Sequence, residues 1–258
     1  MAGRDIRQVK AARSAVLAAR HIPDTLWLLG LVCGLPAAGL WNWYGSVAAA
    51  RFLVGLSVML GVEHIFIAAM IRRIGPEKHS LADIITLSRG VSAAVLAAIV
   101  VAGVTDRAGP AGWLAWLLVL YAATLSDWVD GPLARRAGST LLGGMLDIEC
   151  DSWLTLWLGV AAVIWGGLPW VVVVPPLLRY IQPVLALRQG ALPAGGGLWW
   201  SRVTGVAQMA LFILALAPVN WPLREAMLGV IAWPISLAQL ASMLVLLHPK
   251  LRLHRPLP

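Results

Sequence analysis

Residues 126–151, with the sequence SDWVDGPLARRAGSTLLGGMLDIECD, place four aspartates in a chain that is otherwise mostly apolar. Asp127 and Asp130 are three residues apart, and Asp147 and Asp151 are four apart, so each pair lies on one face of its own helix. An acid within a membrane is costly unless it faces a cavity, a cation or a metal. The sequence therefore predicts two adjacent helices whose four carboxylates converge on a functional site. The simpler alternative is a solvated acidic loop, which the apolar flanks disfavour.

The residues between the two pairs are suited to binding a phosphorylated ligand. Gly131 lets a substrate approach the first helix, Ala134 keeps that face shallow, and Arg135 offers a fork for phosphate oxygens. Gly143 provides the same access on the second helix. Four close carboxylates repel one another, so the cluster must be partly protonated or hold cations, and hard oxygen ligands select Mg²⁺ or Mn²⁺.

These positions form the pattern D-x2-D-G-x2-A-R-x7-G-x3-D-x3-D, and all of its fixed residues are present. The chain thereby resembles the CDP-alcohol phosphotransferases, also called CDP-alcohol phosphatidyltransferases, which are integral membrane enzymes of phospholipid biosynthesis. The resemblance implies an all-α, polytopic transmembrane bundle. Its six-helix core is here preceded by two extra N-terminal membrane helices.

The resemblance also implies the reaction and its residues. A CDP-linked donor, most often CDP-diacylglycerol, loses CMP while its phosphoryl group passes to an alcohol, with two Mg²⁺ or Mn²⁺ ions as cofactors and a homodimer as the assembly. The implied metal ligands are Asp127, Asp130, Asp147 and Asp151, with Asp151 acting as a ligand or as the general base. The implied nucleotide-binding residues are Asp127, Gly131, Ala134, Arg135, Thr86 and Arg89.

Thr86 and Arg89 come from a second family pattern, similar to P-N-x-x-T-x-x-R, which reads A-D-I-I-T-L-S-R in this chain. The departures are Ala82 for proline and Asp83 for asparagine, and Asp83 could instead help to cap its helix. Thr86 and Arg89 share a helical face and could both meet a diphosphate. Arg89 could alternatively extend to the lipid headgroups.

The composition indicates a polytopic membrane protein. Of the 258 residues 60% are hydrophobic and 12% charged, and the mean hydropathy is +0.80. The net charge of +8 does not predict a nucleic-acid partner, because the basic residues lie between apolar runs, where they orient spans. Eight apolar stretches are expected to cross the membrane, at about 25–41, 46–71, 84–104, 112–125, 141–165, 169–187, 203–216 and 226–247.

The expected organisation is a basic segment (1–23), a helix pair (24–74), the phosphotransferase core (75–248) and a basic tail (249–258). Residues 1–23 read either as an amphipathic helix on an anionic membrane surface or as a frayed tail. Alternate loops are rich in Lys and Arg, which predicts that both termini and the aspartates face the cytoplasm. A bacterial inner membrane, with membrane lipids as neighbours, is the expected location.

Polar residues inside two other spans are further candidates. Glu63 and His64 either make a structural contact between helices or line a cavity. Arg179 follows Pro175 and Pro176, which should kink or break their helix, and could hold an anionic acceptor alcohol. Arg136, Arg188 and Arg202 are weaker acceptor candidates, and positive-inside anchoring accounts better for the last two.

Three functions compete at this stage. The first is transfer of a phosphatidyl group from CDP-diacylglycerol to an alcohol, and the second is transfer of a CDP-amino alcohol head group to diacylglycerol. The third is a cation carrier with an acidic site. A carrier explains the acids but not Gly131, Ala134, Arg135 and Gly143, and a guanidinium beside a cation path is counterproductive.

Overall fold

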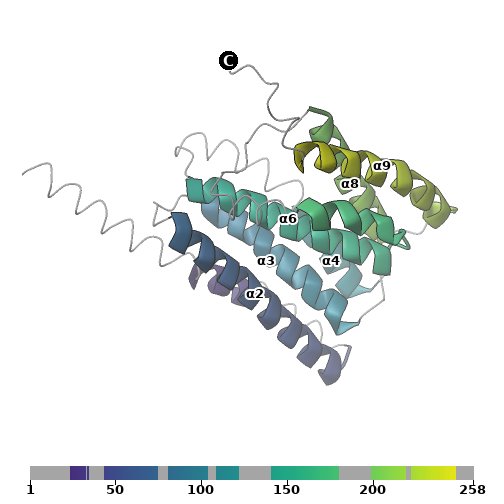
Figure 1. The fold of residues 1–258 in the computed structure, drawn as a ribbon. Coiled ribbons are helices and arrows are strands. Elements are labelled where there is room, and N and C mark those ends of the chain that lie inside the picture. Colours follow the sequence, from purple (N-terminus) through teal and green to yellow (C-terminus); the bar gives the residue numbers. More distant parts are fainter. Residues whose placement is uncertain are drawn as a thin grey trace, which may run out of the picture. The chain divides into compact units, whose positions relative to one another are not determined.

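The chain folds into helices. The computed structural model describes residues 24–32, 34, 44–74, 81–103, 109–121, 141–179, 199–218 and 222–247. Its helices are α2 (Ser46–Ile74), α3 (Leu81–Ala102), α4 (Pro110–Leu120), α6 (Leu141–Ile164), α8 (Trp199–Leu216) and α9 (Arg224–Leu247), with a 3₁₀ turn, η2 (Trp170–Val173). Residues 24–32 and 174–179 are also helical, and no strand occurs in these described ranges. The predicted all-α class is confirmed (Figure 1).

Four of these helices are long and apolar enough to cross a membrane, namely Ser46–Arg72, Ala82–Ala102, Trp199–Leu216 and Arg224–Leu244. They confirm a polytopic membrane protein. Helix α6 has 24 residues and is comparably apolar, apart from three acids in its first half. The predicted spans 112–125 and 169–187 extend past the described residues, and the segments 1–23 and 249–258 lie outside them.

The described residues form two compact units, and each is considered by itself. The first comprises Met1–Val104 and Leu117–Leu154. Helix α3 is central to it, because every residue from Arg89 to Ile99 is buried. A helix buried on all sides needs small residues where its neighbours approach, and four alanines (Ala93, Ala94, Ala97 and Ala98) supply them.

Helix α2 packs antiparallel along α3, as two close contacts show. A Cβ atom on Gly55 would lie 3.2 Å from the Ala98 Cα atom, and a Cβ on Gly90 would collide with the Glu63 carboxyl group. Eight residues separate Gly55 from Glu63 on α2, and eight separate Gly90 from Ala98 on α3, in the opposite order. The two helices therefore stay in contact over roughly 12 Å of their length (Figure 1).

The second unit comprises Thr105–Trp116 and Thr155–Pro258. Its helices α8 and α9 are joined by polar contacts. Arg224, the first residue of α9, is buried and donates to the Leu214 carbonyl at 2.8 Å and to the Ala217 carbonyl at 3.0 Å. These carbonyls are at the end of α8, where backbone acceptors lack partners within the helix. Thr204 of α8 also donates to Gln239 of α9.

Pro175 and Pro176 lie where helical geometry changes. The backbone is 3₁₀ through Val173 and α-helical over residues 174–179. The prolines thus occupy the first turn of the α-helical stretch, a position that tolerates a missing N–H. The sequence predicts a break in this span, and the structure has it at Val174, on the N-terminal side of the prolines.

Candidate functional site

Two aspartates of α6 form the described half of the site. Asp147 and Asp151 are one helical turn apart, and their side chains are 49% and 32% exposed. The intervening Glu149 is buried, so its side chain points away from this partly exposed face. The prediction that Asp147 and Asp151 share one face of a helix agrees with the helical span of α6.

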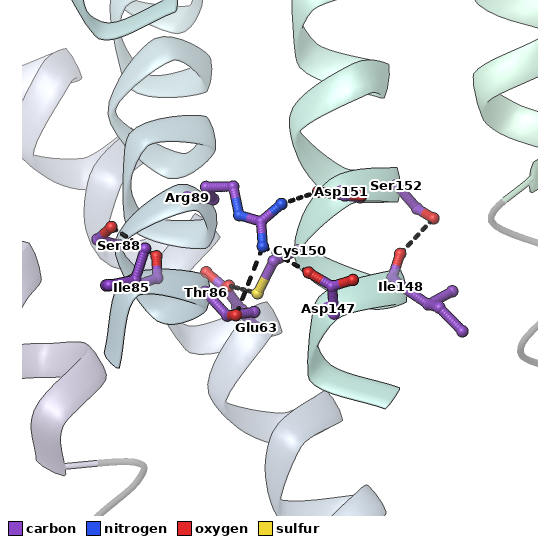
Figure 2. Close-up of polar contacts among 10 residues, drawn as sticks. All are labelled: Glu63, Ile85, Thr86, Ser88, Arg89, Asp147, Ile148, Cys150, Asp151 and Ser152. Carbon is purple, nitrogen blue, oxygen red and sulfur yellow. Dashed lines mark hydrogen bonds and ion pairs between the residues drawn. The ribbon is translucent and has the colours of Figure 1, made fainter. Parts of the chain in front are cut away.

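Arg89 of α3 binds both aspartates. Its Nη1 atom donates to Asp151 Oδ1 at 2.6 Å, and its Nη2 atom donates to Asp147 Oδ1 (Figure 2). The Nη2 atom also lies 3.5 Å from Thr86 Oγ1, one turn earlier on α3. The planar guanidinium presents two nitrogens in a fixed geometry, so one arginine can hold two carboxylates at a set separation.

The bridge also matters electrostatically. The Arg89 side chain is 2% exposed and cannot lose its proton under ordinary conditions, so its charge must be paired inside the unit. In turn, a positive charge between the two carboxylates offsets their mutual repulsion. The alternative that Arg89 extends to the lipid headgroups does not describe this buried side chain.

A side-chain contact links α3 to Tyr121, the last described residue before the aspartate motif (residues 126–151). The Tyr121 hydroxyl lies 3.0 Å from the hydroxyl of Ser88, the residue that precedes Arg89 on α3. Six residues separate Tyr121 from Asp127. Neither hydroxyl stands out in the sequence, because the pair is formed by packing between residues 33 positions apart.

The predicted polar pair of α2, Glu63 and His64, makes contacts between helices. The Cys150 thiol donates to Glu63 Oε1 at 3.6 Å, and the Trp27 indole donates to His64 Nδ1 at 3.1 Å. Of the two interpretations of Glu63 and His64, the contact between helices is the one observed. Nothing in the residue pattern indicated that Glu63 would touch the helix of the aspartate motif.

Several predicted site residues lie outside the described part of the chain. They are Asp127, Asp130, Gly131, Ala134, Arg135, Arg136 and Arg188. Arg179 is half-buried and belongs to the second unit, whereas Asp147 and Asp151 belong to the first. Arg202 is exposed near the start of α8. The acceptor-binding roles of these arginines therefore stay predictions.

The donor chemistry of the described half fits a hard divalent cation. Asp147 and Asp151 offer carboxylate oxygens one turn apart on a partly exposed face, as Mg²⁺ and Mn²⁺ prefer. Within the described ranges no three His, Cys, Asp or Glu side chains gather as a metal site. A complete site thus requires further ligands, for which Asp127 and Asp130 remain the predicted source.

Comparison with known protein families agrees with this arrangement. The family model for CDP-alcohol phosphatidyltransferase matches residues 79–244, which is more than half of the chain and includes Thr86, Arg89 and the whole aspartate motif. No curated protein and no solved structure matches the chain. The match begins after α2, so the described residues 24–32 and α2 lie outside it. The chain belongs to the CDP-alcohol phosphatidyltransferase family, membrane transferases that generally depend on a divalent metal.

Proposed function

We propose that this protein transfers the phosphatidyl group of CDP-diacylglycerol to an alcohol and releases CMP. The observation that carries the proposal is the pair Asp147 and Asp151, held by the buried Arg89 in a chain of this family. A cation carrier would explain the acids but not the phosphate-binding pattern of Gly131, Ala134, Arg135 and Gly143, nor the match to a transferase family. Transfer of a CDP-amino alcohol head group to diacylglycerol would use the same site.

In the proposed reaction, the acceptor's hydroxyl oxygen attacks the phosphorus of the phosphatidyl group. The bond from that phosphorus to the oxygen shared with CMP breaks, and CMP leaves with the bonding electrons. The hydroxyl proton passes to a carboxylate oxygen of Asp151, the proposed general base. Arg89 holds Asp151 Oδ1 and so fixes the plane in which the carboxylate meets the acceptor.

The remaining roles follow the family pattern. Asp127, Asp130, Asp147 and Asp151 are the proposed metal ligands, and the nucleotide lies against Gly131, Ala134, Arg135, Thr86 and Arg89, with Asp127 shared between both sets. Two bound Mg²⁺ or Mn²⁺ ions would neutralise charge on the diphosphate and on the attacking and leaving oxygens. Arg179 and Arg136 are the proposed contacts for an anionic acceptor.

We also propose that the site and both termini face the cytoplasm of a bacterium, with the protein in its inner membrane as a homodimer. The support is the distribution of charge, since Lys and Arg concentrate in alternate loops, including the motif's Arg135 and Arg136. Nucleotide-activated donors are made on that side of the membrane.

The decisive experiment measures CMP release by the purified protein in detergent micelles. CDP-diacylglycerol is supplied with Mg²⁺ or Mn²⁺ and, one at a time, glycerol 3-phosphate, inositol phosphate and serine. We expect release with one acceptor and none in excess chelator. A parallel reaction supplies a CDP-amino alcohol with diacylglycerol, and release only there would replace the proposed donor. No release in any arm would refute the transferase proposal.

A further inference from the structure

Helix α2 lies outside the region that matches the family, yet it contacts the helices that carry the site. The match begins at residue 79, whereas α2 ends at Ile74. Within the first unit α2 runs along α3 and contacts α6 through the side chain of Glu63. An accessory helix with no part in the site could pack through apolar residues alone.

Glu63 lies where α2, α3 and α6 meet, next to Gly90 of α3 and Cys150 of α6. Its side chain is buried, and it accepts the 3.6 Å hydrogen bond from Cys150 of α6. A Cβ atom on Gly90 of α3 would lie 2.8 Å from the Glu63 carboxyl carbon and 3.1 Å from Cys150 Sγ. Gly90 is therefore the residue that leaves room for the carboxyl group.

Both neighbours of Glu63 are adjacent in sequence to the partners of the site's ion pair. Gly90 follows Arg89, and Cys150 precedes Asp151. Figure 2 shows Glu63 and Cys150 beside the bridge from Arg89 to Asp147 and Asp151. If the Glu63 contact moves Gly90 or Cys150, the adjacent Arg89 or Asp151 must move as well. Such a movement would change the 2.6 Å hydrogen bond between Arg89 and Asp151.

A glutamate is a costly choice if only packing is needed. Its Oε2 atom has no hydrogen-bond partner among the described residues, and a buried oxygen without a partner typically costs about 1–3 kcal/mol. An apolar residue of similar size would fill the space without that cost. Side chains that break a packing rule in this way tend to mark functional positions.

We propose that Glu63 is a positioning residue of the transferase, which sets the spacing of α3 and α6 and so holds Arg89 against Asp151. Helix α2 is then an integral part of the site. This inference rests on the proposed function, since it assigns the bridge a part in metal binding and turnover. Glu63 acts through Gly90 and Cys150 and does not touch substrate.

The test uses substitutions that change side-chain volume at Glu63, at Gly90 and at both positions together. Gly90→Ala places a methyl group against the carboxyl, and Glu63→Ala leaves a void, so each single variant should disturb the bridge. The double variant removes the carboxyl that the methyl would strike and fills part of the void. Glu63→Gln keeps the volume and the acceptor oxygen for Cys150, and serves as the conservative variant.

Two properties of each variant are measured in detergent micelles. One is Mn²⁺ affinity by electron paramagnetic resonance, which needs no substrate, and the other is CMP release with kcat and KM for the donor. We expect Glu63→Ala and Gly90→Ala to weaken Mn²⁺ binding by roughly 10- to 100-fold, as removal of groups that orient metal ligands usually does. The double variant should recover at least about fivefold over Gly90→Ala, and Glu63→Gln should stay within about threefold of the parent protein.

Two control variants separate positioning from general packing. Gly61→Ala adds a methyl group on α2 where no described heavy atom lies within 4 Å. Ile67→Ala removes a fully buried side chain one turn beyond Glu63, and makes a void while leaving the Glu63, Gly90 and Cys150 residues unchanged. Both should leave Mn²⁺ affinity unchanged, although Ile67→Ala should lower the melting temperature.

The proposal is overturned if Glu63→Ala binds Mn²⁺ and releases CMP like the parent protein, or if Ile67→Ala weakens Mn²⁺ binding as much as Glu63→Ala does. It is also overturned if the fold-loss of Mn²⁺ affinity in the double variant equals the product of the losses in Glu63→Ala and Gly90→Ala. If Gly90→Ala does not fold, Glu63→Ala and Glu63→Gln still decide the question. A parent protein that neither binds Mn²⁺ nor releases CMP refutes the proposed function itself, and the positioning role falls with it.

Discussion

Arg89→Lys is the sharpest single perturbation of the site, because it keeps the buried positive charge and removes the fork. A lysine ammonium is a compact charge and cannot hold two carboxylates in the geometry that Nη1 and Nη2 provide. We expect the variant to keep one of the two contacts and to fold. The effect on turnover then measures what the second contact contributes.

The expected size of the effect of Arg89→Lys depends on how exposed the two aspartate partners are. A hydrogen bond to a charged group contributes roughly 1.5–3 kcal/mol when shielded, and an exposed ion pair roughly 0–1 kcal/mol. The Asp147 side chain is half exposed and Asp151 is about a third exposed, so one lost contact here should cost about 1–2 kcal/mol. This corresponds to a fall in kcat/KM of about 5- to 30-fold.

The assay is the initial rate of CMP release over a range of CDP-diacylglycerol concentrations, together with the melting temperature in the same detergent. Arg51→Lys is the matched control, since Arg51 is an exposed arginine on α2 in the same unit. An unchanged kcat/KM for Arg89→Lys would refute the reasoning. A rise in donor KM with unchanged kcat would show instead that Arg89 acts on the nucleotide rather than by orienting Asp151.

Three further substitutions test the assigned roles. Asp147→Asn should raise the Mn²⁺ or Mg²⁺ concentration needed for half-maximal activity while the protein still folds, and full turnover in excess chelator would contradict the metal role. Asp151→Asn should lower kcat by roughly 10²- to 10⁴-fold with little effect on donor affinity, if it is the base. An equal loss of donor affinity, measured by equilibrium binding, would make it chiefly a ligand. Arg179→Lys should raise the KM of an anionic acceptor more than that of the donor, and unchanged KM values would move the acceptor site to Arg136, Arg188 or Arg202.

The sequence predicted helices well and their partners poorly. The span predicted from residue 84 begins at Leu81, because the polar Asp83 lies inside the first turn, where a carboxylate favours the helix N-terminus. Arg89 was predicted to meet a nucleotide, and nothing in its spacing indicated that two aspartates some sixty residues later would bind it. Helical periodicity defines a face, whereas the neighbour of that face depends on tertiary packing.

Arg224 is another residue whose role depends on packing. In the sequence Arg224 lies between the predicted spans 203–216 and 226–247, where a basic residue enters any prediction of topology from charge. The structure shows that its guanidinium binds carbonyls at the end of α8. An arginine used in this way satisfies backbone acceptors, so it carries little information on topology.

The geometry of the aspartate site is governed by its arginine more than by its acids. A carboxylate on a partly exposed face can be solvated by water or bind a cation, whereas the buried guanidinium of Arg89 keeps its charge and must find acceptors within the protein. Among the described residues Arg89 is one of the largest fully buried side chains, and it extends from α3, which is more deeply buried than α2. Helix α6 therefore has to present carboxylates where α3 places that charge, and any helix that sets the position of α3, as α2 does, also sets the position of the aspartates.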